Sequence, residues 1–310
     1  MKKLIATLAT FTLALGAAFA QDLAAVTDLY NTGAEAVSAG NKADALNAFV
    51  EALKQAEALG EEGQEIVTNC KNIIPNLKMS LAKDLVKESK FDEAVAALQD
   101  VQKVADEYEA LDVLDEAKTL IPQVKMSKAG TLLNAKDYDA AAAAYQEILA
   151  ENPSDGTAAL RLGVALNGAG KVDEAKAAFE QAAANGQAAT ANKQLGNIFL
   201  KEAAAALKAK KYADAVTAAV KVNDYAENAQ AWQIAGQASQ LAGKNNDAIK
   251  YFEKYLAAAP DASNAGAIAY TVGALYQGAK NNAKAKELYS KAVSDPKYGA
   301  EAKKMLDALK

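Results

Sequence analysis

Residues 228–260 read NAQAWQIAGQASQLAGKNNDAIKYFEKYLAAAP, and this stretch decides the fold of the chain. Its small and large residues stand at regular spacing. Trp232 is followed four residues later by Gly236, and Ala248 is followed four residues later by Phe252. The stretch then closes on a proline. This order of tryptophan, glycine, alanine, aromatic residue and proline is the pattern against which the other segments are compared.

The segment resembles a tetratricopeptide repeat, in which W-x2-L-G-x2-Y is followed by A-x3-F and then by P over about 34 residues. Ala235 and Ser239 stand here in place of the usual Leu and Tyr. The resemblance implies two antiparallel helices that cannot bury their apolar faces alone. Such a unit needs neighbours of the same kind, so further copies are expected along the chain.

The same register recurs six more times. The two helices should approach closely at Gly33 and Ala45, which are small, and Phe49 should fill the space between one unit and the next. The anchor alanines are Ala45, Ala94, Ala141, Ala175, Ala215, Ala248 and Ala285. The other residues predicted to pack the repeats are Gly33, Phe49, Tyr145, Gly163, Phe179, Trp232, Gly236, Phe252, Gly273 and Tyr289.

The repeats predict an all-α fold. By its resemblance to the family, it should be a right-handed superhelical solenoid of about seven antiparallel helix pairs. The units are expected near 26–59, 64–106, 110–153, 156–187, 190–227, 228–260 and 262–296, within a solenoid of residues 21–296. Residues 297–310 are amphipathic and should form a C-terminal capping helix, since terminal repeats need a cover. The alternative is a partner-binding helix.

Two units are longer than the others, and each contains a proline in its first helix. The sequence around the prolines is nearly duplicated, as IPNLKMSLA at 74–82 and IPQVKMSKA at 121–129. Either one long helix kinks at Pro75 and Pro122, or a short extra helix ends before each proline. The uninterrupted apolar spacing favours the long kinked helix. A third long first helix is expected over 190–210.

Residues 1–20, MKKLIATLATFTLALGAAFA, are typical of a secretory signal peptide with cleavage after Ala20. An uncleaved membrane anchor is the alternative, although the apolar run is short for a span. No later stretch is long and apolar enough to cross a membrane. The chain is therefore expected to be a bacterial protein exported to the periplasm or secreted. In that oxidising compartment the lone Cys70 should be buried as a small apolar residue.

Composition narrows the function classes. Histidine is absent and cysteine occurs once, which excludes His-based metal sites, Ser-His and Cys-His nucleophile pairs and an intrachain disulfide. Acidic pairs such as Asp92-Glu93 and Asp173-Glu174 open second helices, where they favour the helix dipole. No metal or cofactor is expected, and the protein is predicted not to be an enzyme. Catalysis would need a pocket that the sequence does not reveal.

Charge argues against nucleic acid as a partner. The formal net charge is −5 at pH 7, the pI is about 5.1, and Arg161 is the only arginine. No run of lysines forms a stripe. Nucleic acid is therefore not expected as a partner, and the resemblance to the repeat family implies a protein or peptide partner instead.

The resemblance implies that the first helices line a concave face that holds an extended peptide or a partner helix. Gln230, Gln233, Gln237 and Gln240 fall on one face of such a helix, where each amide can both donate and accept hydrogen bonds. An ordinary solvated helix face is the alternative. The other candidate contacts, which packing between units could also explain, are Tyr30, Met79, Lys83, Lys87, Met126, Asn134, Asn167, Asn197, Tyr270 and Gln277.

These observations favour a non-catalytic protein–protein interaction module or scaffold in the bacterial cell envelope. It would bind a peptide or protein partner on the concave face. The alternative is a structural protein that acts by self-association of the solenoid, which would make it a homo-oligomer.

Overall fold

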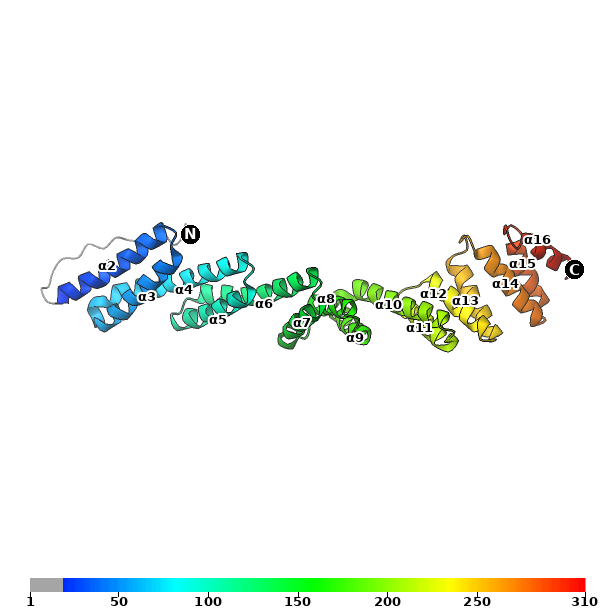
Figure 1. The fold of residues 1–310 in the computed structure, drawn as a ribbon, viewed down its shortest axis with the longest axis horizontal. Coiled ribbons are helices and arrows are strands. Elements are labelled where there is room, and N and C mark those ends of the chain that lie inside the picture. The colour runs from blue at the N-terminus through cyan, green and yellow to red at the C-terminus, as the bar shows by residue number, and fades with distance from the viewer. Residues whose placement is uncertain (1–18, 310) are drawn as a thin grey trace. The chain divides into compact units, whose positions relative to one another are not determined.

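The computed structural model describes residues 19–309, and the described residues form helices without any strand (Figure 1). Residues 1–18, with most of the predicted signal peptide, and residue 310 lie outside the described residues. The chain divides into two compact units, Met1–Pro153 and Ser154–Lys310. Within the described part of the chain, no helix is long and apolar enough to span a bilayer.

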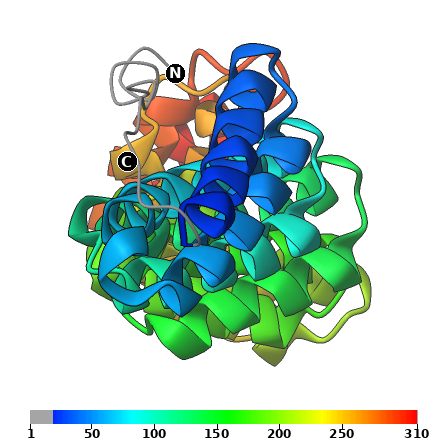
Figure 2. The same ribbon diagram turned by 90° about the vertical axis from the view of Figure 1, so that its left-hand side faces the viewer.

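The N-terminal unit holds three antiparallel helix pairs in chain order. Figure 2 looks at this unit from its α2 end, where α2 is the outermost helix. The pairs correspond to the first three expected repeats. They are α2 (Phe19–Ser38) with α3 (Lys42–Ala58), α4 (Gln64–Lys87) with α5 (Phe91–Glu107), and α6 (Leu111–Asn134) with α7 (Tyr138–Glu151); a short 3-10 turn, η1 (Gly60–Gly63), links α3 to α4.

The C-terminal unit holds four further pairs and a final helix. They are α8 (Gly156–Gly168) with α9 (Val172–Ala182), α10 (Ala188–Lys208) with α11 (Tyr212–Tyr225), α12 (Ala229–Leu241) with α13 (Asn245–Ala258), α14 (Ala265–Gly278) with α15 (Asn282–Ala292), and α16 (Gly299–Ala308); the π-helical turn η2 (Ala183–Gln187) follows α9. Helix α16 lies against α15. Its Ala302 is fully buried, and Met305 and Leu306 pack on the apolar cluster of this unit. This packing is what a cap on the last repeat requires.

The turn inside each helix pair has the same backbone geometry in all seven pairs. One residue of the turn takes a left-handed conformation, and the next amide donates to a carbonyl five residues earlier, as Lys211 N does to Ala206 O at 2.9 Å. This is the Schellman ending of a helix. The left-handed residues are Gly40, Ser89, Lys136, Gly170, Lys210, Gly243 and Lys280. The turns therefore repeat as faithfully as the helices.

Helices α4 and α6 continue without a break through Pro75 and Pro122. Each proline removes one backbone hydrogen bond. The apolar face runs on across the proline, since Ile74 and Leu77 are both buried on either side of Pro75. The long-helix interpretation therefore agrees with the structure, and the separate short helix is absent from these segments.

A repeated contact between a glycine and an aromatic ring holds four of the pairs together. A Cβ atom built on Gly236 would lie 2.5 Å from the ring of Phe252, which stands sixteen residues later on the second helix. Glycine is therefore needed for the two helices to approach this closely. The four pairs of this kind are Gly33 with Phe49, Gly163 with Phe179, Gly236 with Phe252, and Gly273 with Tyr289.

The other three pairs use alanine at the same position. The corresponding residues are Ala82 with Leu98, Ala129 with Tyr145, and Ala203 with Ala219, and all six are fully buried. Every residue predicted from the sequence to pack the repeats is buried. In each unit, one small residue of the first helix thus packs against a residue of the second helix whose side chain is of equal or larger size.

Two tyrosines at this larger position differ in their hydrogen bonding. Among the described residues, the Tyr145 hydroxyl is buried without a partner, whereas the Tyr289 hydroxyl donates to Gln277 Oε1 at 2.7 Å. A buried unsatisfied hydroxyl costs about 1–3 kcal/mol, and a satisfied one contributes about 1 kcal/mol. Tyr145→Phe is therefore expected to stabilise the protein by about 1 kcal/mol, and Tyr289→Phe to destabilise it by about the same amount. Thermal unfolding followed by circular dichroism measures both, and shifts of equal sign would contradict the assignment.

Cys70 lies fully buried in the N-terminal unit, as expected. Burial raises the pKa of its thiol to about 12. At pH 8 the folded protein should react with iodoacetamide about 10³-fold more slowly than the urea-unfolded chain, because only the thiolate reacts. Mass spectrometry of the alkylated protein measures this ratio, and equal rates would show that the thiol is accessible.

The same shift has a consequence for stability at alkaline pH. Between about pH 8.5 and 12 the unfolded thiol loses its proton while the folded thiol keeps it. The contribution of Cys70 to stability is therefore complete below this window and is lost as the pH rises through it.

Candidate partner-binding surface

The predicted contact residues of the first helices stand at different distances in sequence from the glycine or alanine that packs against the second helix. Tyr30 and Tyr270 stand three positions before Gly33 and Gly273. The ring of Tyr30 packs edge-on against Phe49 with a centroid distance of 5.3 Å, and Tyr270 lies 5.5 Å from Tyr289. This register therefore faces the second helix of its own unit. Met79, Met126 and Gln233 share it.

Two of the predicted contacts are core residues. Tyr30 is 2% exposed and Met79 is 3% exposed. Tyr30 belongs to the apolar cluster that includes Phe49 and Cys70, while Met79 packs in the cluster of Leu98. The prediction that these side chains contact a partner is corrected here, because neighbouring helices cover them.

The remaining candidates reach the surface. Lys87, Asn134, Asn167, Asn197, Gln230 and Gln240 are exposed. Lys83, Met126, Gln233, Gln237, Tyr270 and Gln277 are half-buried. Exposed and half-buried polar side chains thus follow the first helices within each unit.

In the N-terminal unit, a shallow groove of about 410 Å³ separates the first helices α4 and α6. Lys83 lines it from α4. Its Nζ donates to Glu116 Oε1 at 2.6 Å, and both side chains are substantially exposed. An exposed pair of this kind is worth only about 0–1 kcal/mol, so a ligand can displace it. The α6 residues of the groove are Asp115, Glu116, Thr119, Leu120 and Gln123.

The α6 side of this groove was missed in the sequence. Gln123 stands six positions before Ala129, just as Gln230 stands six positions before Gly236. Aligning the repeats on the small residue would have placed Gln123 on the same helical face as Gln230.

Lys87 is held in a cluster at the end of α4. Its Nζ donates to Asp84 Oδ1 at 2.7 Å, and Lys42 of α3 donates to the other carboxylate oxygen. The hydrogen bonds from Lys42 and then from Lys87 lower the pKa of Asp84. Most of the Lys87 side chain is nonetheless exposed, so its two other N–H donors remain available to a ligand.

In the C-terminal unit, four glutamines line one face of α12. Gln230 and Gln240 are exposed, and Gln233 and Gln237 are half-buried. Ile234, which directly follows Gln233, is buried. Among the described residues, none of the four amides has a hydrogen-bond partner. The row therefore offers both donors and acceptors to a ligand.

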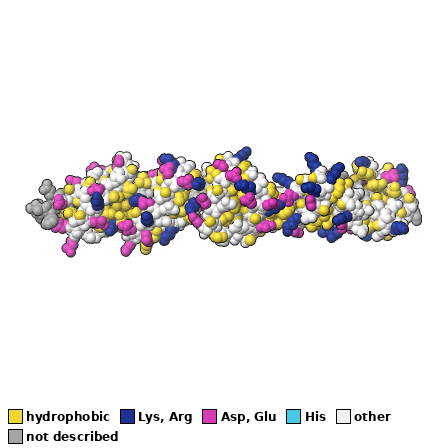
Figure 3. All heavy atoms as spheres, turned by 60° about the horizontal axis from the view of Figure 1, so that its bottom comes forward, with side chains coloured by type: hydrophobic (Ala, Val, Ile, Leu, Met, Phe, Trp, Pro, Cys, Tyr) yellow, Lys and Arg dark blue, Asp and Glu magenta, His cyan; other side chains and the backbone are white. Residues whose placement is uncertain are grey.

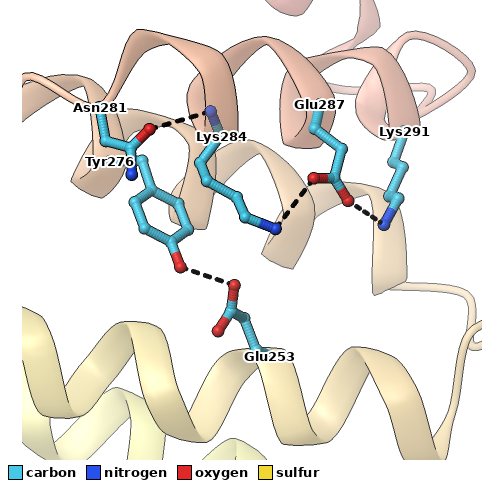
Figure 4. Close-up of polar contacts among 6 residues, drawn as sticks. All are labelled: Glu253, Tyr276, Asn281, Lys284, Glu287 and Lys291. Atoms are coloured by element: carbon cyan, nitrogen blue, oxygen red, sulfur yellow. Dashed lines mark hydrogen bonds and ion pairs between the residues drawn. The ribbon is translucent and has the colours of Figure 1, made fainter.

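Neighbouring polar residues of this unit are used for packing. The Tyr276 hydroxyl of α14 donates to Glu253 Oε1 of α13 at 2.7 Å (Figure 4). Burial, followed by this hydrogen bond, raises the pKa of Tyr276 to about 12. In Figure 4, Glu287 lies between Lys284 and Lys291 of the same helix, with both N–O distances 3.1 Å. The Tyr276–Glu253 hydrogen bond therefore joins α14 to α13, whereas Glu287 forms ion pairs within its own helix.

Trp232 is also a packing residue. It is 8% exposed and stacks on Tyr251 with a centroid distance of 5.9 Å. Lys254 Nζ lies 4.0 Å from the centre of its ring, which is a cation–π contact. Trp232, the aromatic landmark of the sequence, thus joins α12 to α13.

Acidic groups in the described part of the chain do not assemble into a metal site. A hollow of about 480 Å³ beside α14 contains Asp261 and Asp295. Asp295 uses its Oδ1 atom to accept from the amides of Lys297 and Tyr298 at 2.9 and 2.8 Å. This carboxylate therefore orders the turn that precedes α16.

Comparison with known proteins identifies the repeats. Residues 128–190 and 229–262 each match a family model described as Tetratricopeptide repeat. The second match covers nearly the whole of the stretch around Trp232. These matches show that the chain contains tetratricopeptide repeats, and the helix pairs of the described residues share the register of the matched segments. Repeat solenoids of this kind act through their extended binding surfaces.

Several solved structures are similar to this chain. YrrB, a tetratricopeptide-repeat protein with an unusual peptide-binding site, is 23% identical over 58% of this chain and 91% of its own, with a TM-score of 0.32. MamA is 19% identical over 58% and 94%, with a TM-score of 0.34. A tetratricopeptide-repeat protein from Parabacteroides merdae is 14% identical over 93% and 99%, with a TM-score of 0.29. No curated protein matches.

Proposed function

We propose that this protein is a non-catalytic interaction scaffold of the bacterial cell envelope, which binds an extended peptide or protein segment along its first helices. The observation that carries the proposal is the glutamine row of α12. Four amides face one way, and none has a partner among the described residues. Each amide can donate to a carbonyl and accept from an N–H of a peptide backbone. A row of this kind suits recognition of main chain with little dependence on sequence.

The groove between α4 and α6 supports the same proposal for the N-terminal unit. Its lining combines Lys83, Glu116 and Gln123 with the apolar Leu120. Such a lining can hold both polar and apolar groups of an extended segment. Each unit thus offers a polar, accessible stretch on its first helices.

Export rests on the N-terminal sequence. The positively charged start, the apolar core and the Ala-x-Ala end support cleavage after Ala20. Mass spectrometry of the protein from an envelope fraction should find Gln21 as the first residue. A retained residue 1 would contradict cleavage.

Affinity capture from the native envelope tests the binding surface. A variant with Gln237→Glu, Gln240→Glu and Lys87→Glu should capture at least tenfold less partner than the wild-type chain. The substitutions add negative charge and remove hydrogen-bond donors on the proposed binding surface. The matched control carries Gln99→Glu, Gln146→Glu and Lys103→Glu, which make the same charge change on exposed positions of second helices. Equal capture by both variants would place the partner elsewhere.

A further inference from the structure

Exposed lysines gather at the turns inside the last three complete helix pairs. Antiparallel pairs that follow one another place these turns at the same end of every pair, so the lysines form one edge, named here the lysine edge. Among the described residues, no carboxylate pairs with any of its five members. They are Lys208, Lys210, Lys211, Lys244 and Lys280. In Figure 3, dark blue side chains project from the C-terminal unit on the face shown.

Exposed carboxylates gather at the turns between helix pairs of the N-terminal unit. This acidic edge surrounds η1 and the turn from α5 to α6. In the described structure, the cation that pairs with this acidic edge is Lys71, whose Nζ lies 3.2 Å from Glu57 Oε1. Its members are Glu57, Glu61, Glu62, Glu65, Asp106, Glu107, Glu109 and Asp112.

The charges of the two units have opposite sign. Residues 21–153 contain 24 Asp and Glu against 12 Lys, a formal charge of −12. Residues 154–310 contain 15 Asp and Glu against 20 Lys and Arg, a formal charge of +5. A polyanion such as nucleic acid would be repelled by the first unit. A second copy of the chain offers each unit its electrostatic complement.

We propose that the lysine edge of one copy docks on the acidic edge of another. The lysine edge is built from turns inside successive helix pairs and the acidic edge from turns between successive pairs, so charged groups recur along each edge at the spacing of one repeat. Several turns of one copy can therefore meet several turns of the other in register. Each copy carries both edges, so copies join either as a closed pair or as a head-to-tail chain.

The expected contact is rich in exposed charge, and salt therefore controls it. At 50 mM NaCl the charges act over more than 10 Å, and at 500 mM the screening length falls to about 4 Å. Association measured by sedimentation velocity should weaken at least tenfold between these two conditions. Complementary charges of this kind also set which surfaces meet.

Charge-swap complementation tests the docking directly. One variant carries Lys210→Glu, Lys211→Glu and Lys244→Glu, and the other carries Glu61→Lys, Glu62→Lys and Glu107→Lys. Each alone should associate at least tenfold more weakly than the wild-type chain. An equimolar mixture should regain association, because every reversed edge then finds an opposite one. Circular dichroism of each variant shows that its helices remain folded.

Lys193→Glu, Lys201→Glu and Lys303→Glu make the same charge change at exposed positions away from the edge and should leave association intact. A wild-type chain that stays monomeric at 50 mM NaCl, or a mixture that fails to associate, overturns the proposal. If that monomer binds vesicles of 30% phosphatidylglycerol and the lysine-edge variant does not, the edge contacts a membrane instead, which also overturns it.

Discussion

Replacing Phe252 with alanine is expected to lower the free energy of unfolding of the C-terminal unit by about 3–5 kcal/mol. The ring is almost fully buried between α12 and α13, against Gly236. It belongs to the same apolar cluster as Trp232 and Tyr255. Glycine cannot fill the space that the ring leaves, so the variant loses both the buried area and the packing contacts.

Trp232 provides the measurement, because it is the only tryptophan of the chain and lies in this cluster. Its fluorescence in urea should show a transition at much lower denaturant in Phe252→Ala. Leu241→Ala is the control, since Leu241 is 61% exposed and its removal should change stability by less than about 0.5 kcal/mol. Equal transitions in the two variants would contradict the packing described for this pair.

The same variant tests whether the repeats are independent. In a solenoid each repeat contacts only its neighbours. The loss at Phe252 should therefore leave the slow alkylation of Cys70 in the N-terminal unit unchanged. Faster alkylation would mean that the whole chain unfolds as one cooperative block.

Replacing Gly236 with valine is expected to destabilise the C-terminal unit by at least about 1–3 kcal/mol. Its Cβ atom alone would lie 2.5 Å from Phe252 Cδ1, and the two further methyl groups have no space. Either the ring must leave its position or the two helices must separate. The urea transition of Trp232 measures the loss directly.

Gly196 supplies a control with the opposite expected sign. A Cβ atom at Gly196, on α10, would meet Val222 at 4.0 Å, an ordinary contact. Gly196→Ala should therefore stabilise the helix by up to about 1 kcal/mol. The double change Gly236→Ala with Phe252→Leu imitates the natural pair Ala82 with Leu98 and should recover part of the loss. A neutral Gly236→Val would show that the close approach of the helices is not required.

Much of the fold follows from a single aligned register. The pattern around Gly236 was enough to find Gly33, Gly163 and Gly273. Each of these glycines precedes its aromatic partner by the same number of residues in the sequence. The continuous helices at Pro75 and Pro122 also followed, since the apolar spacing did not change at the prolines. The left-handed turns at Ser89 and Lys210 were harder to predict. Glycine is the usual sequence signal for a left-handed residue, and neither position has it.

The contact face was harder to predict because of helix geometry. Positions three before and one after the small residue lie only about 40° apart around the helix. Tyr30 occupies the first of these positions and is buried, whereas Gln237 occupies the second and is half-exposed. A rotation this small is decided by how the next helix pair packs. Tyrosine and methionine suit both a core and a contact surface, so residue type could not separate the two.

Photocrosslinking in living cells tests the binding face most directly. A photoreactive amino acid replaces Gln237 on the first helix α12 or, as the control, exposed Lys250 on the second helix α13. We expect a discrete cross-linked partner from position 237 and none from position 250. The same partner from both positions, or a partner from position 250 alone, would contradict binding along the first helices.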